Sequence, residues 1–324
     1  MTEKPELQIF GLGGTIAMAP SQNEGAGVRP TLTADDLIRA APELTDIASI
    51  KAETLSLKGS ANLAFREIVA LCERAENCSS GGIVVTQGTD TMEETSFLAN
   101  LLYRGASPLV FTGAMRSPTQ PGADGRANLL AASLTALSTE APSVCVVMND
   151  EIHHPYYVMK AHTSNVAAFQ SPIRGPIGQV AENVVDFHPV REAPLFEKPD
   201  RFAPVALLSA LLDDDGNLFD TILGAGYAGL VVEGFGAGHV SEVIAEKLAE
   251  IAKEIPVILS SRVRAGSVFE RTYGYRGAEI DLLNKGLVPA GRLSGRKARI
   301  LLSLILGLGL KDWRKEFAQV VKQV

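Results

Sequence analysis

Residues 82–95, GIVVTQGTDTMEET, predict a strand, a tight polar turn and a helix in direct succession. The apolar run 83–85 is typical of a strand that is buried on both faces. It breaks into the polar residues 86–91, and apolar residues then recur at helical spacing from Met92 to Leu102. In parallel α/β sheets, ligands bind at the carboxyl ends of strands, so this turn is a candidate site.

A helix cap is the alternative explanation of this turn. Thr89 or Asp90 would be the N-cap, and Glu93 or Glu94 would complete a capping box. A cap uses one or two of these groups, whereas the turn carries three hydroxyls, an amide and a carboxylate within six residues. We therefore favour a functional site.

Segments typical of strands and helices alternate along the chain, which predicts an α/β fold with parallel sheets. We expect a larger N-terminal domain over residues 1–190, a linker over 191–204 and a smaller α/β domain over 205–324. Residues 151–200 show no periodic pattern, and the last helix is expected at about 296–306. Polar turns follow five expected strands of the first domain, at 11–15, 58–62, 86–91, 112–118 and 149–151. The site is therefore expected in the N-terminal domain.

Charge and composition exclude several classes of protein. The 324 residues carry a formal net charge of -7, so no electrostatic footprint for nucleic acid is present. The most apolar C-terminal run, Ile300–Leu310, is too short to span a bilayer, and we expect no membrane partner. Three cysteines without paired spacing, and an N-terminus without a signal-peptide pattern, predict a soluble cytoplasmic protein.

No metal or cofactor is expected. His153 and His154 are adjacent and predicted on a loop surface, and no HExxH motif occurs. The turn GLGGTI lacks the G-x-G-x-x-G spacing of dinucleotide sites, and no P-loop is present.

The polar turns are rich in hydroxyls but contain no G-x-S-x-G elbow and no evident histidine triad. A hydroxyl nucleophile without a histidine needs another base, such as lysine. Between Cys78 and Lys198 the only lysine is Lys160. Lys160 could complete a Thr–Asp–Lys set with Thr89 and Asp90. A lysine that is only a solvated surface charge is an equally good explanation.

Several of these segments resemble the bacterial-type L-asparaginases, and the similarity extends over essentially the whole chain. They are GLGGTIAM (11–18), VVTQGTDTMEET (84–95), FTGAMRSPT (111–119), ADGRANL (123–129), VVMND (146–150) and GRKARILL (295–302). The resemblance implies a larger parallel domain with a left-handed crossover and a smaller flavodoxin-like domain. It also implies a tetramer, built as a dimer of intimate dimers.

By this resemblance Thr15 is the nucleophile that attacks the side-chain amide and forms an acyl-enzyme. Thr89, Asp90 and Lys160 are the second catalytic set, and Asp90 also grips the substrate's α-amino group. The implied substrate-binding positions are Ser60 for the α-carboxylate, the backbone at Ala114 as part of an oxyanion hole, Glu279 lent to the neighbouring subunit's site, and Gly59, Ala61, Gly88 and His239.

This chain departs from the family at three positions. Residues 16–34 contain no counterpart of the family's lid tyrosine, and Gly27 or Val28 stands there. Ala61 replaces a common glutamine, and His239 replaces the asparagine of a GxGN turn. Losing a buried hydrogen-bond partner costs about 1–3 kcal/mol, so we expect the changes to affect substrate choice more than reaction type. Tyr156 and Tyr157 are candidate replacements for the lid tyrosine.

The resemblance therefore predicts an amidohydrolase that converts L-asparagine to L-aspartate and ammonia without a cofactor. The same chemistry on glutamine, D-asparagine or another small amide is the first alternative. A non-catalytic amino-acid sensor, or a subunit of a tRNA-linked amidotransferase, is the second.

Overall fold

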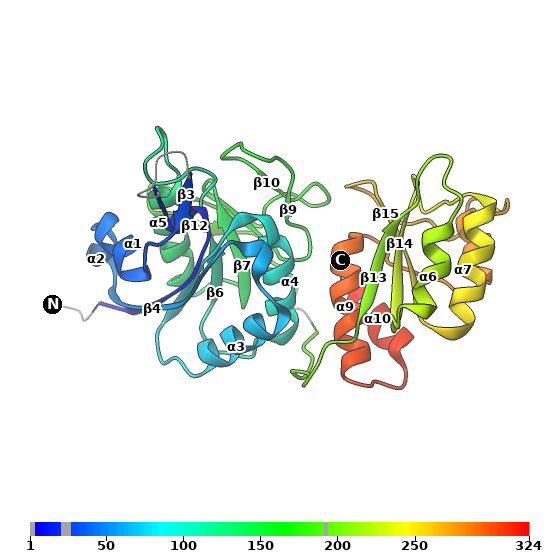
Figure 1. The fold of residues 1–324 in the computed structure, drawn as a ribbon. Coiled ribbons are helices and arrows are strands. Elements are labelled where there is room, and N and C mark those ends of the chain that lie inside the picture. Colours follow the sequence, from blue (N-terminus) through cyan, green and yellow to red (C-terminus); the bar gives the residue numbers. More distant parts are fainter. Residues whose placement is uncertain (1–3, 21–26, 191–193, 324) are drawn as a thin grey trace. The chain divides into compact units, whose positions relative to one another are not determined.

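The computed structural model describes residues 4–20, 27–190 and 194–323. The chain divides into two compact units, Met1–Phe196 and Glu197–Val324, each with its own sheet (Figure 1). The division falls inside the segment that was expected to link two domains.

The first unit contains a mostly parallel sheet of eight strands in the described residues. Its parallel part consists of β4 (Ser49–Lys58), β1 (Glu6–Gly13), β5 (Gly82–Thr86), β6 (Leu109–Thr112) and β7 (Val144–Met148), in that spatial order. β1 lies between β4 and β5, so the connection from β4 to β5 passes across β1. The handedness of this crossover stays a prediction.

The sheet continues through part of the segment that showed no periodic pattern. β8 (Glu151–His153), β11 (Gly178–Ala181) and β12 (Val184–Phe187) extend it by antiparallel pairing. The expectation of irregular structure was wrong here because three or four residues are too few to show an alternating pattern. β9 (Met159–Lys160) and β10 (Phe169–Gln170) form a separate hairpin.

Residues 17–34, where the family has its lid, contain a second hairpin. β2 (Met18–Pro20) pairs with β3 (Val28–Pro30), and residues 21–26 lie outside the described part of the chain. Gly27 and Val28, at the position of the family's lid tyrosine, are exposed.

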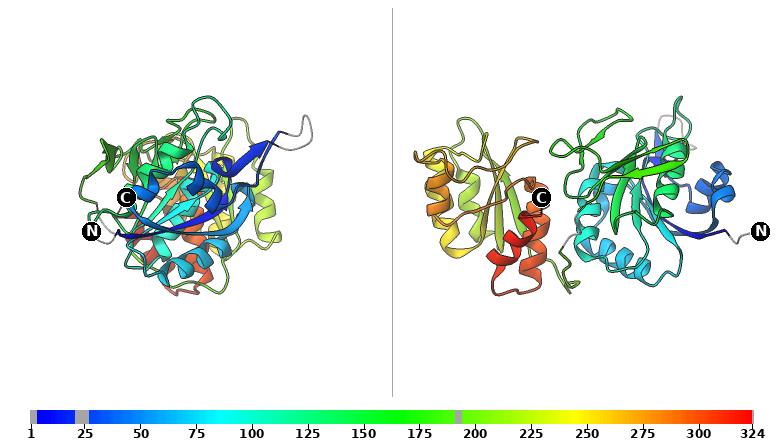
Figure 2. Two further views of the ribbon diagram at one scale, coloured as in Figure 1. Left: turned by 90° about the vertical axis from the view of Figure 1, so that its left-hand side faces the viewer. Right: turned by 180° about the vertical axis from the view of Figure 1, so that it is seen from behind.

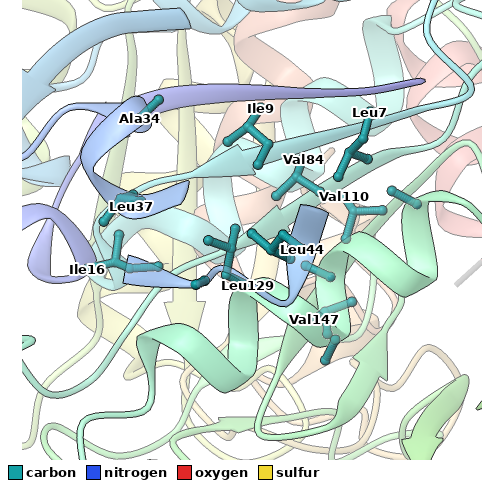
Figure 3. Close-up of a cluster of buried hydrophobic side chains, with 14 of the residues drawn as sticks. Leu7, Ile9, Ile16, Ala34, Leu37, Leu44, Val84, Val110, Leu129 and Val147 are labelled. Carbon is teal, nitrogen blue, oxygen red and sulfur yellow. The ribbon is translucent and has the colours of Figure 1, made fainter. Parts of the chain in front are cut away.

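Two helical layers cover the first sheet. On one face, α1 (Ala34–Ala40), α2 (Leu44–Ile47) and α5 (Gly125–Ala136) pack over β1, β5, β6 and β7. Figure 3 shows this core, in which Leu7, Val84 and Val110 of the strands meet Leu44 and Leu129 of the helices. α3 (Phe65–Glu76) and α4 (Met92–Leu102) pack together, and α4 contacts β7.

Local sequence signals account for several of these elements. All five residues of β5 are buried, as its apolar run predicts. Thr33 caps α1 in a capping box with Asp36. All five residues of β7 are likewise buried.

The second unit contains a parallel sheet of β13 (Val205–Ser209), β14 (Gly229–Gly234), β15 (Val257–Ser261) and β16 (Val288–Pro289). One face carries α6 (Asn217–Gly224) and α7 (Glu242–Glu254), which bury Phe219, Ile244 and Leu248. The other carries α9 (Gly295–Gly307), against which α10 (Trp313–Val321) packs. The rear view shows yellow α7 on the opposite side of the sheet from the orange and red α9 and α10 (Figure 2).

The α/β class with two parallel-sheet domains is confirmed. Three described helices of the second unit escaped sequence analysis: α6, α8 (Glu279–Asn284) and α10, which follows the helix that was expected to be the last. Within the described residues, no helix combines the length and apolar character that crossing a membrane requires.

Candidate active site

Four neighbouring strands of the first sheet end in turns at one edge. Thr15 follows β1, Ser60 follows β4, Thr89 follows β5 and Ala114 follows β6. Because these strands are parallel and adjacent, their carboxyl ends lie together. Three of the turns are short 3-10 helices: η1 (Thr15–Ala17), η2 (Ser60–Asn62) and η3 (Thr89–Thr91).

The Thr15 turn touches the Thr89 turn through two glycines. Gly14 has φ 82°, and a methyl group placed on its Cα would overlap the Gly88 nitrogen. Its conformation and this contact both require glycine. A methyl group on Gly88 would in turn lie 2.8 Å from Ser60 Oγ. The backbone therefore brings the residues around Thr15, Ser60 and Thr89 into direct contact.

Lys160 joins the Thr89 turn from about seventy residues further along the chain. Its Nζ donates to Thr89 Oγ1 at 2.8 Å and to Asp90 Oδ1 at 2.6 Å. The lysine side chain is 15% exposed and that of Asp90 is 72% exposed. The alternative of a solvated surface charge at Lys160 was therefore wrong, since its ammonium group is largely buried and doubly bonded.

The helix-cap interpretation of this turn was also wrong. The N-cap of α4 is Thr91, whose side chain makes no capping bond. Thr91 Oγ1 instead donates to the Ser60 carbonyl oxygen at 3.1 Å. Thr89 and Asp90 bond to Lys160, so neither serves as the cap of α4.

Ser60 is buried, and its Oγ has no hydrogen-bond partner among the described residues. A buried hydroxyl without a partner costs about 1–3 kcal/mol, which a bound ligand would offset. Gly59 is the N-cap of η2, and Ala61 is exposed beside Ser60. This corner of the site therefore offers one unpaired hydroxyl at Ser60, and Ala61 adds no polar side-chain group.

The turn at Ala114 is held by residues to which the sequence assigned no role. Asp124 accepts N–H bonds from Met115, at 2.9 Å, and from Arg116, also at 2.9 Å. Asn128 is buried, and its Nδ2 donates to the Gly113 carbonyl at 3.0 Å. The only signal for them was the ADGRANL segment, which carried a resemblance but no mechanism.

The candidate replacements for the lid tyrosine lie elsewhere. Tyr156 is 3% exposed and packs against Phe97, and burial raises the pKa of its phenol above the usual range. Tyr157 lies beneath the Arg174 guanidinium and beside His154. Tyr156 is therefore a core residue whose proton is held tightly.

The described residues contain no cluster of three or more His, Cys, Asp or Glu side chains that could hold a metal ion. His153 and His154, which were expected on a loop surface, are buried. His153 Nδ1 lies 3.0 Å from Ser171 Oγ. The expectation of surface positions was wrong because β8 continues the main sheet through this segment.

His239 and Glu279 form a separate cluster in the second unit. His239 Nε2 lies 3.1 Å from Glu279 Oε2, and Tyr275 Oη lies 3.1 Å from His239 Nδ1. Glu279 Oε1 accepts N–H bonds from Thr272 at 2.8 Å and Tyr273 at 2.6 Å. Both carboxylate oxygens are thus engaged, and the residue is fully buried.

Two opposing effects act on the Glu279 carboxyl. Burial acts to raise its pKa, but the N–H groups of Tyr273 and Thr272, together with the His239 imidazole, stabilise the charged form and hold the pKa below its usual value. The lending of Glu279 to a neighbouring site stays a prediction.

Comparison with known proteins shows which class this fold and this site represent. A family model described as "Asparaginase, N-terminal" matches residues 6–192, and one described as "Glutaminase/Asparaginase C-terminal domain" matches residues 204–317. Together they define an asparaginase-type amidohydrolase. The chain belongs to the asparaginase family, as the sequence motifs predicted.

Relatives agree with this assignment over nearly the full chain. "Probable L-asparaginase periplasmic" of Haemophilus influenzae is 34% identical over 315 residues, covering 93% of this chain and 88% of that protein. "L-asparaginase 2" of Escherichia coli is 33% identical, with coverages of 93% and 89%. A glutamyl-tRNA(Gln) amidotransferase subunit of Methanosarcina barkeri is 30% identical, with coverages of 99% and 77%.

Among solved structures, the "Probable Cytoplasmic L-asparaginase from Campylobacter jejuni" matches with a TM-score of 0.86 at 31% identity. The match covers 98% of this chain and 100% of that one.

The Glu279 cluster gives a testable pH dependence of stability. Because the folded-state pKa is lowered, the charged carboxylate stabilises the fold fully above its unfolded pKa of about 4.3, and this contribution is lost as the pH falls through the folded pKa. The free energy of unfolding, measured with urea, should therefore be higher for wild type than for Glu279→Gln at neutral pH. This difference between the two proteins should narrow toward about pH 3.

Glu254→Gln is a matched control, because Glu254 is an exposed residue of the same unit. The free energy of unfolding of Glu254→Gln should stay close to that of wild type at every pH measured. A Glu279→Gln difference that does not depend on pH would contradict the stabilised carboxylate.

Proposed function

We propose that the protein hydrolyses L-asparagine to L-aspartate and ammonia through a threonine nucleophile. The observation that carries the proposal is the meeting of two threonine turns at one sheet edge, with Lys160 bonded to Thr89 and Asp90. Such a set provides a hydroxyl nucleophile and a second hydroxyl with its own lysine partner.

In the first half-reaction, Thr15 Oγ1 attacks the side-chain amide carbon of asparagine. The C–N bond then breaks, the threonine proton leaves with the amide nitrogen as ammonia, and an aspartyl ester of Thr15 remains. Backbone N–H groups near Thr89 and Ala114 would stabilise the oxyanion that forms during attack. This electrostatic contribution is usually the largest in acyl transfer.

In the second half-reaction, water attacks the ester carbonyl carbon and releases aspartate and free Thr15. Thr89 and Lys160 would orient and activate this water, since Lys160 Nζ is hydrogen-bonded to Thr89 Oγ1. Neither half-reaction calls for a cofactor.

Two further groups would bind the substrate's amino-acid end. Ser60 Oγ, buried and without a partner among the described residues, suits the α-carboxylate. Asp90, whose carboxylate is largely exposed despite its bond to Lys160, suits the α-amino group. Gly59, Gly88 and Ala61 line the same corner, and none of the three brings a polar side chain.

A second candidate keeps the chemistry and changes the substrate to another small amide, such as L-glutamine or D-asparagine. The exposed Ala61 and the His239–Glu279 pair favour it, because Ala61 and His239 both stand where the family has carboxamides. A sensor or a tRNA-linked amidotransferase subunit is less consistent with the intact threonine and lysine set and with the acidic net charge.

We also propose a cytoplasmic homotetramer, a dimer of intimate dimers in which Glu279 acts in the neighbouring copy's site. Because the Glu279 carboxylate is bonded to His239, and His239 to Tyr275, both residues would lie beside Glu279 at the neighbouring copy's site. Cys72, Cys78 and Cys145 are free thiols, in keeping with a reducing compartment.

Replacing the nucleophile tests the reaction. Thr15→Ala should lower ammonia release from asparagine on the order of 10³-fold or more, as loss of other hydroxyl nucleophiles does. Thr221→Ala is the matched control, because exposed Thr221 donates to the Leu218 carbonyl of its own helix in the second unit, and its rate should stay within about twofold of wild type. Turnover that persists in Thr15→Ala would exclude Thr15 as the nucleophile.

A panel of amides separates the two candidate substrates. Ammonia release is measured from L-asparagine, D-asparagine and L-glutamine at the same enzyme concentration, and kcat/KM is expected to be highest for L-asparagine. A higher value for any other amide would favour the second candidate.

A further inference from the structure

Lys160 lies on a segment that the main sheet does not hold. β9 contributes only two residues, Met159 and Lys160, and pairs only with β10 among the described strands. The next residue closes the hairpin, since Ala161 N–H donates to the Ala168 carbonyl at 2.7 Å. The hydrogen bonds within this short hairpin do not by themselves fix the distance between Lys160 and the Thr89 turn.

A buried carboxylate ties this hairpin to the site. The backbone N–H of Lys160 donates to Glu93 Oε2 at 2.8 Å. Glu93 is 2% exposed and lies in the first turn of α4. A carboxylate at this end of a helix is stabilised by the helix dipole, which compensates in part for its burial.

Glu93 also belongs to the segment that Lys160 reaches with its side chain. α4 begins at Met92, directly after η3, so Thr89, Asp90 and Glu93 are carried by one continuous stretch of rigid backbone. Lys160 is therefore held to this stretch at both ends, with its N–H on Glu93 and its Nζ on Thr89 and Asp90. Fixing the main chain of Lys160 restricts the positions that its long side chain can reach.

We propose that Glu93 is a positioning residue that holds Lys160 at the Thr89 hydroxyl. The inference rests on the proposed function of Lys160 and adds a residue that does not itself touch the substrate. The acceptor oxygen of Glu93, rather than its charge, carries the role, because the donor on Lys160 is a neutral backbone N–H.

The size of the effect follows from the geometry of proton transfer. A displacement of about 1 Å from a change remote from the chemistry can cost about 10²-fold in rate. Without the Glu93 acceptor, the Lys160 main chain loses its direct hydrogen bond to α4. The loss should therefore affect kcat, since binding of the substrate's amino-acid end involves Ser60 and the Asp90 carboxylate.

Two substitutions of similar shape separate the acceptor from the rest of the side chain. Glu93→Met removes the acceptor and should lower kcat by about 10- to 100-fold with KM nearly unchanged. Glu93→Gln keeps an oxygen that can accept the Lys160 N–H, so its kcat should return close to that of wild type. Glu76→Met is the matched control, because Glu76 of α3 likewise accepts a loop N–H, that of Arg104, at 2.8 Å.

A second measurement does not depend on turnover. Modification of the Lys160 amine by an acylating reagent, followed by peptide mass spectrometry, should be faster in Glu93→Met than in wild type and unchanged in Glu76→Met. If wild type hydrolyses no amide, the proposed function fails, and the labelling rates still decide whether Glu93 positions Lys160.

The proposal is overturned if folded Glu93→Met keeps the wild-type kcat and Lys160 labelling rate, or if Glu93→Gln loses as much as Glu93→Met. Should Glu93→Met fail to fold, Glu93→Asp takes its place, since it keeps the charge but withdraws the acceptor by one methylene. It should then show the same fall in kcat and the same faster labelling, and wild-type values would overturn the proposal.

Discussion

The contact between the Gly14 and Gly88 backbones is the constraint on which the site depends. Neither position has room for a methyl group, and Gly14 adopts a φ that other residues rarely adopt. This close approach places the turn after β1 against the turn after β5. The turns that carry Thr15 and Thr89, which follow strands that pair side by side, therefore lie in contact.

Polar bonds hold several of the remaining site residues, beside the apolar packing that buries Ala114. Asp124 and Asn128 hold the turn around Ala114, and Glu93 and Thr89 hold Lys160. Ser60 is the exception, since its buried hydroxyl has no partner among the described residues. A satisfied polar network makes a turn rigid, and the unpaired Ser60 hydroxyl is where the proposed function places the substrate's α-carboxylate.

Much of this arrangement could be predicted from local sequence. The buried strand at residues 82–86, the helix at 125–136 and the Thr33 cap follow from apolar periodicity and capping chemistry. Lys160 was found by elimination, as the only lysine between Cys78 and Lys198. The motifs then identified the family, which the comparisons confirm.

What sequence analysis missed depends on distant contacts. β11 and β12 are four residues each, too short to show an alternating pattern; β12 pairs with β11, and β11 joins the sheet by pairing with β8, which lies well before it in the chain. Glu93 looked like a capping residue because the Lys160 N–H that it binds lies in a hairpin far along the chain. The burial of Glu279 likewise depends on the backbone of Thr272 and Tyr273 rather than on its own helix.

The most direct test of the two-threonine account is to locate the covalent intermediate. Enzyme mixed with asparagine is quenched in acid within one turnover, digested and analysed by mass spectrometry. The account predicts an aspartyl ester on the peptide that contains Thr15 and none on the peptide that contains Thr89. An ester on Thr89 would contradict it.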